Sequence, residues 1–137
     1  MNKRIKDKAE ELENYLSELE EFTPSSFEDY INDAKTKAAC ERYAEKIIEA
    51  IVDLAFLAIK EKKLKMPEDD KQAFSILADN KIISVELASK LKDAKGMRNI
   101  LAHEYGEVDN EIIFEAISQE LIKDAREFIK EVEKEPR

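Results

Sequence analysis

Apolar residues recur at intervals of three and four along most of this chain, the spacing that places side chains on one face of an α-helix. The first run predicts a helix from Lys3 to Glu20, with an apolar face formed by Ile5, Ala9, Leu12, Leu16 and Leu19. The segment Thr23–Ser26 breaks this pattern. Ser25 and Glu28 have the spacing of a capping box, in which each side chain satisfies a free backbone donor, so we expect a second helical segment to begin there.

The second helical segment extends from Phe27 to Lys63 without a proline or glycine, and the pattern allows a bend near Asn32. A broad apolar stripe runs along it, formed by Ala44, Ile47, Ile48, Ile51, Leu54, Ala55 and Ala58. Because small residues such as Ala38 and Ala39 permit neighbouring helices to approach closely, we expect this segment to lie at the centre of a helical bundle.

Two further helices are predicted in the middle of the chain. The stretch Lys71–Ala78 is short, and Asp69 and Asp70 suit its start. Ser84 begins a longer helix, which we expect to end near Gly106, since glycine adopts the left-handed conformation of a helix end at little cost. This longer helix carries the residues with the most specific chemistry.

The last helix is predicted to be capped by Asp109, and its apolar stripe continues to Phe128. Charged residues make up 40% of the chain, whereas glycine occurs twice and proline three times, a composition typical of long solvated helices with short connections. The sequence therefore predicts an all-α fold, an antiparallel bundle of four to six helices, in a single domain that covers residues 1–137.

The charge and the cysteine and histidine counts exclude several kinds of function. A net charge of -9 opposes indiscriminate binding to polyanions, so any RNA site must be a local basic cleft. A single cysteine excludes an internal disulfide, and one cysteine with one histidine cannot form a zinc-like cluster within one chain, although carboxylates alone could still hold a hard cation. We assign no metal site and no cofactor. The chain has no apolar run long enough to span a membrane, and we expect a cytoplasmic protein.

The most informative motif is RxxxxHxY, formed by Arg98, His103 and Tyr105. These residue types suit cleavage of an RNA phosphodiester by the neighbouring ribose 2′-hydroxyl. The imidazole of His103 can take or give a proton near neutral pH, and the guanidinium of Arg98 can stabilise charge on the phosphoryl oxygens. Tyr105 can orient the phosphate or stack on a base. We therefore assign Arg98 and His103 as catalytic candidates and Tyr105 as a substrate-binding candidate.

Helical geometry complicates this assignment. At about 100° per residue, Arg98 and Tyr105 point the same way, whereas His103 lies about 140° from Arg98. Either the helix distorts near its end at Gly106, or a second copy of the chain supplies the missing group across a two-fold interface. We favour the symmetric dimer.

Other polar residues are weaker candidates. Glu41, Arg42 and Asp53 on the long central helix could orient the catalytic groups, although solvated surface charge is the simpler interpretation. Apolar neighbours flank Asp53, which predicts a half-buried carboxylate. Asn99 could contact a phosphate or face solvent. Arg98 itself could merely pair with Asp93.

The motif and its surroundings resemble the HEPN domains, specifically the HepT-like toxins. The similarity extends over ERYAEKIIEAIVDLA at 41–55 and LKDAKGMRNILAHEYGEVD at 91–109. It implies a homodimeric helical bundle with a metal-independent ribonuclease cleft at the dimer interface. It also implies a partner, a nucleotidyltransferase antitoxin of the MntA kind that attaches AMP to the motif tyrosine, here Tyr105. The alternative is a non-catalytic HEPN module that binds a nucleotide or this partner.

Overall fold

The computed structural model describes residues 2–103 and 109–134, with the backbone alone at His103. Within these residues it contains helices and no strand, which confirms the predicted all-α class. The elements are α1 (Lys3–Phe22), α2 (Phe27–Asn32), α3 (Ala34–Glu61), α4 (Asp70–Asp79), α5 (Val85–His103), α6 (Asn110–Glu115), a π-helical turn (Ala116–Leu121) and α7 (Ile122–Glu133). Since α6, the π-turn and α7 follow one another without a break, the described chain forms six helical rods.

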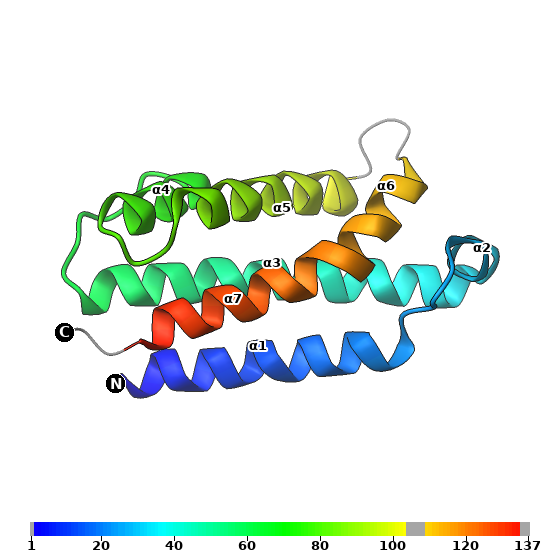
Figure 1. Ribbon diagram of the computed structural model, residues 1–137, viewed down its shortest axis with the longest axis horizontal. Helices are drawn as coiled ribbons and strands as arrows, with labels where there is room; N and C mark the ends of the chain where they lie inside the picture. The colour runs from blue at the N-terminus through cyan, green and yellow to red at the C-terminus, as the bar shows by residue number, and fades with distance from the viewer. Residues whose placement is uncertain (1, 104–108, 135–137) are drawn as a thin grey trace.

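Four long rods run alternately up and down the molecule (Figure 1). In this view α3 lies between α1 and α5, and α7 crosses in front of it, while the short helices α2 and α4 lie at opposite ends. The predicted antiparallel bundle with the long helix at its centre is therefore confirmed. No helix among the described residues is long and apolar enough to cross a membrane.

One continuous apolar core joins these rods. The largest fully buried side chains are Tyr30, Phe74, Phe128, Ile5, Leu12, Leu16, Leu19, Ile47, Ile48, Ile51, Leu54 and Ile59. They include the predicted apolar faces of α1 and α3, because a helix with a one-sided stripe becomes stable by burying it against its neighbours. Phe74 of α4 meets Phe128 of α7 edge to face, with ring centroids 6.2 Å apart, and thereby connects the shortest of the predicted helices to the last.

Several helix starts follow the capping chemistry that the sequence predicts. Ser84 Oγ accepts a hydrogen bond from the Leu87 backbone N–H at 3.0 Å, and Asp69 Oδ1 accepts one from Gln72 at 2.8 Å. Asp109 Oδ1 accepts from the backbone N–H groups of residues 111 and 112. These side chains satisfy backbone donors that a helix leaves free in its first turn.

Two predicted boundaries are wrong in detail. The cap of α2 is Ser26, whose Oγ accepts from the Asp29 N–H, and not Ser25. Starting one residue later places the ring of Phe27 against Phe114 of α6, with centroids 6.0 Å apart. The segment expected to run from residue 27 to 63 is two helices, because Asp33 ends α2 and caps α3 by accepting from the Thr36 N–H.

The π-turn has a cause in the sequence. On either side of the π-turn, from residue 113 to residue 125, the buried apolar residues are Ile113, Ile117, Leu121 and Ala125, spaced four apart three times in succession. In a regular α-helix each step of four advances the face by about 40°, so the stripe would leave the core. A π-turn takes up more residues per turn and keeps the stripe aligned.

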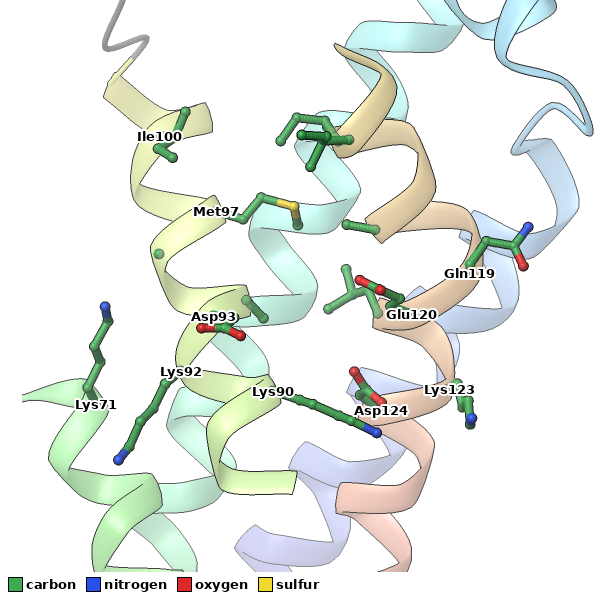
Figure 2. Close-up of a pocket in the computed structure, with 16 residues that line it drawn as sticks. Lys71, Lys90, Lys92, Asp93, Met97, Ile100, Gln119, Glu120, Lys123 and Asp124 are labelled. Carbon is green, nitrogen blue, oxygen red and sulfur yellow. The ribbon is translucent and has the colours of Figure 1, made fainter. Parts of the chain in front are cut away.

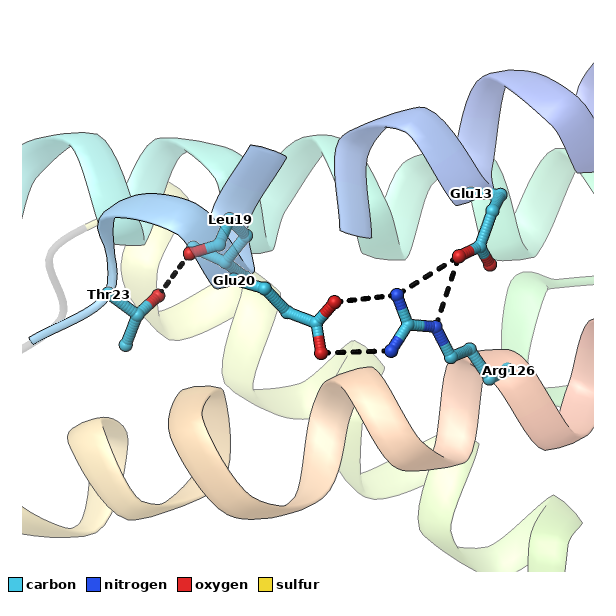
Figure 3. A network of polar contacts seen from close by, with 5 residues as sticks. All are labelled: Glu13, Leu19, Glu20, Thr23 and Arg126. Carbon is cyan, nitrogen blue, oxygen red and sulfur yellow. Dashed lines mark hydrogen bonds and ion pairs between the residues drawn. The ribbon is translucent and has the colours of Figure 1, made fainter. Parts of the chain in front are cut away.

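An arginine ties the first and last rods together. The Arg126 guanidinium on α7 donates to Glu20 through both of its terminal nitrogens, at 2.9 and 2.7 Å, and its Nε donates to Glu13 at 3.1 Å (Figure 3). The hydrogen bonds from Arg126 lower the pKa of the Glu20 carboxyl. This bidentate geometry fixes the lateral position of α7 against α1.

Candidate active site on helix α5

Arg98 lies in the C-terminal half of α5 and points toward α3. Its Nη2 donates a hydrogen bond to Glu49 Oε1 at 2.5 Å, and the Arg98 side chain is 23% exposed. The Nε of Arg98 is buried and has no hydrogen-bond partner among the described residues. Because leaving a buried charged donor unsatisfied is costly, this atom sets Arg98 apart from the other described residues.

The other motif residues are only partly described. His103 is the last residue of α5, and its side chain lies outside the described residues, as does Tyr105. The described helix is regular α-helix from residue 98 to residue 103, so the two positions lie about 140° apart around its axis. The structure therefore does not bring Arg98 and His103 of one chain to the same side of α5. Asn99 is partly exposed on the face next to that of Arg98.

The central-helix candidates have partners of their own. Glu41 accepts hydrogen bonds from Tyr30 Oη at 3.1 Å and from Lys37 Nζ at 2.6 Å. Burial, followed by the adjacent Glu41 carboxylate, raises the pKa of Tyr30, so its hydroxyl stays protonated and donates. Arg42 is exposed and lies 3.9 Å from Glu45. None of these contacts involves Arg98.

Asp53 was expected to be half-buried, and this prediction is wrong. Its side chain is 60% exposed, and its Oδ2 lies 3.5 Å from Lys8 Nζ on α1. The carboxylate lies on the outer face of α3, beside α1, whereas the apolar residues on either side of it in sequence turn inward. Asp53 consequently belongs to the contact between α1 and α3.

The structure adds Glu49, which sequence reasoning missed. Four carboxylates, Glu41, Glu45, Glu49 and Asp53, are spaced four residues apart along α3, so they form one slanting column that turns by about 40° around the helix at each step. The printed sequence shows this column, but it does not show which member faces the motif arginine. Glu49 is the carboxylate that contacts Arg98 because of the way α5 packs against α3. The sequence suggested that Arg98 could pair with Asp93 on the same helix, but in the structure Arg98 pairs with Glu49 on α3.

Comparisons with known proteins identify the family of this chain. The family model for HepT-like ribonucleases matches residues 12–132. The chain is 30% identical over 114 residues to the tRNA nuclease HepT of Aphanizomenon flos-aquae, which spans 83% of this chain and 78% of that protein. It is 31% identical over 85 residues to the mRNA nuclease HepT of Shewanella oneidensis, which spans 62% of this chain and 63% of that protein.

A solved structure gives the same fold. The tri-AMPylated HEPN toxin of Shewanella oneidensis, solved in complex with MNT antitoxin, superposes with a TM-score of 0.90 over 98% of this chain and 100% of that one, at 24% identity. Helix for helix, the bundle is that of a HEPN protein. The chain belongs to the HepT-like ribonuclease family, which confirms the resemblance, and its enzymatic class is ribonuclease.

Proposed function

We propose that this chain is a toxin endoribonuclease that cuts RNA without a metal ion, at a composite RxxxxHxY site between two copies of the chain. The observation that carries the proposal is Arg98, a partly buried guanidinium held by one carboxylate while its Nε has no partner among the described residues. Such a group is prepared to accept a phosphate, because a guanidinium offers its remaining donors as a planar fork.

The chemistry needs a proton acceptor and a proton donor in addition to Arg98. As the ribose 2′-oxygen attacks the adjacent phosphorus, its proton passes to an imidazole. The P–O5′ bond then breaks, and the 5′-oxygen takes a proton as it leaves, so that one fragment ends in a 2′,3′-cyclic phosphate. His103 is the only histidine in the chain and supplies this proton transfer. Arg98 stabilises the charge on the non-bridging oxygens.

A dimer is part of the proposal because the two groups diverge on one helix. With residues 98 and 103 about 140° apart on α5, one copy cannot direct both toward one phosphate. A two-fold axis beside the C-terminal end of α5 places Arg98 of one copy near the imidazole of the other.

We further propose that a nucleotidyltransferase antitoxin silences this site by transferring AMP from ATP to the Tyr105 hydroxyl, with release of pyrophosphate. The AMPylated Shewanella oneidensis toxin bound to MNT antitoxin supports this step. The added phosphate would bring negative charge to a cleft built for the phosphate of RNA, so substrate and modification compete for the same cations.

The direct test uses purified wild-type protein, labelled RNA and excess EDTA. We expect cleavage that persists in EDTA and yields 2′,3′-cyclic phosphate ends. Binding of RNA or nucleotide without cleavage would favour the non-catalytic module instead. The intact mass of protein co-expressed with its nucleotidyltransferase tests the modification, and an increase by whole AMP groups that is absent from a Tyr105→Phe variant is the expected result.

Glu49 gives a prediction about positioning. Glu49→Ala removes the acceptor that holds Nη2 of Arg98, and we expect kcat to fall about 10-fold with little change in KM, the size of one partly exposed charge-assisted hydrogen bond. Glu49→Gln keeps an acceptor oxygen and should recover part of the loss. Glu45→Ala, one turn earlier in the same column, is the matched control. Equal losses in Glu49→Ala and Glu45→Ala would contradict a specific role.

A further inference from the structure

A groove separates α5 from the rod formed by α6, the π-turn and α7. Its volume is about 690 Å³, which lies within the range of ligand-binding pockets. Its apolar lining comes from both walls: Ala94, Met97, Ile100, Ile112, Ile113, Ala116 and Leu121. The π-turn forms one wall, and such turns are frequent at functional sites. Met97 and Ile100 flank Arg98 in sequence, so the groove reaches the C-terminal half of α5, whereas Arg98 itself points toward α3 and is not part of the lining.

A buried carboxylate opens into this groove. Asp124 of α7 is 8% exposed and lines the groove, and it has no hydrogen bond or ion pair with another described residue within contact distance. Burial raises its pKa, while the charge of nearby Lys90 acts in the opposite direction. Figure 2 shows the side chains of Lys90 and Asp124 pointing toward each other across the groove. Its carboxylate oxygens are not among the fully buried atoms without a partner in the described residues, so they are accessible to a ligand in the groove.

The rim of the groove is rich in lysine although the chain as a whole is acidic. Lys71, Lys90, Lys92 and Lys123 line it, against the three carboxylates Asp93, Glu120 and Asp124. None of these four lysines forms an ion pair with a described residue, as is true of most lysines in that part of the chain, so their charges are available to a ligand. Lysines left available around an apolar floor complement the phosphates of a nucleic acid strand.

We infer that this groove binds the nucleotide of the RNA substrate next to the scissile bond, and that Asp124 recognises its base as guanine. A carboxylate has two acceptor oxygens and no donor, and guanine offers two adjacent N–H donors, N1–H and the N2 amine, on its Watson–Crick edge. Lys90 and Lys123 neutralise the flanking phosphates, and the apolar floor covers the base. The inference deepens the proposed function, and it rests on that function for the identity of the ligand.

The lysines are tested by binding rather than by cleavage. A His103→Ala background prevents turnover, and a short labelled RNA serves as the probe. Replacing both Lys90 and Lys123 by glutamine should weaken binding about 10-fold and reduce its salt dependence by about two phosphate contacts. The matched control replaces Lys6 and Lys130, two exposed lysines outside the groove, and carries the same change in charge. Equal weakening in both double variants would overturn the inference.

The base assignment is tested with oligouridylates that contain one guanosine or one inosine, which lacks the N2 amine. We expect the chain to bind the guanosine oligomer about 10-fold more tightly and Asp124→Asn to bind both alike, because an amide cannot accept both hydrogen bonds. Equal binding of both oligomers by the wild-type groove would overturn the assignment to guanine. Thermal unfolding of each variant verifies that the bundle is intact.

The outcomes separate this inference from the proposed function. If the wild-type chain cleaves RNA but the groove variants bind like their control, the groove inference fails and the function stands. If the chain binds RNA through the groove but cuts none, the function fails and the groove stands. Loss of self-association or of antitoxin binding in the groove variants, with RNA binding unchanged, would make the groove a protein interface and would overturn the inference.

Discussion

Replacing His103 by alanine is expected to abolish RNA cleavage, with kcat/KM lower by about 10³-fold, because this residue is the only imidazole available for proton transfer. We expect the dimer to persist and helical content to be unchanged, because alanine is the residue most favourable to a helix. The measurement is cleavage of labelled RNA, with circular dichroism and sedimentation as structural checks. A variant that cuts RNA at the wild-type rate would remove His103 from the mechanism.

The same variant also tests how the site is assembled. If Arg98 and His103 act from different copies, a mixed dimer of Arg98→Ala and His103→Ala chains contains one dead site and one complete site, and it should recover about half of the wild-type activity. Each variant alone should be inactive. Mixed dimers isolated with two different affinity tags provide the sample. If the mixed dimer is as inactive as its parents, the two groups act within one chain, and the composite site is excluded.

Arg98→Lys is expected to lower kcat about 100-fold even though the positive charge is kept. The guanidinium bonds to Glu49 with one nitrogen and has further donors for a phosphate, whereas an ammonium on a flexible chain cannot hold both partners in one plane. Arg4→Lys, on the exposed surface of α1, is the control and should cleave normally. Activity within a few-fold of the wild type in Arg98→Lys would show that charge alone suffices.

The sequence predicted which segments are helical more completely than it predicted where each helix begins and ends. Apolar spacing located the helices of the bundle, because a one-sided stripe can be buried in only one way. Capping residues located the starts at Ser84 and Asp109, but the choice between Ser25 and Ser26 depended on the contact of Phe27 with a helix more than eighty residues away. Local patterns contain no information about such a contact.

In the candidate site too, the sequence showed the local motif but not the contacts between helices. The motif at Arg98 was visible because spacing along one helix is a local property. Glu49 was not, since it is one of four carboxylates at identical spacing, and each of them meets a different neighbour: Tyr30 and Lys37 for Glu41, Arg42 for Glu45, Arg98 for Glu49, and Lys8 for Asp53. The register between α3 and α5 decides among them, and register is fixed only when the whole core packs.

The π-turn at residues 116–121 has a consequence for comparing relatives. It behaves as a single extra residue accommodated inside a helix, so the matching gap in an alignment belongs within this helix and not in a neighbouring loop. A relative without the extra residue is expected to have an unbroken α-helix here, with the residues that match Lys123 and Asp124 on the same face, because losing the residue and losing the π-turn offset each other. Once the gap is placed inside the helix, the residues of α7 that line the groove can be compared directly between members of the family.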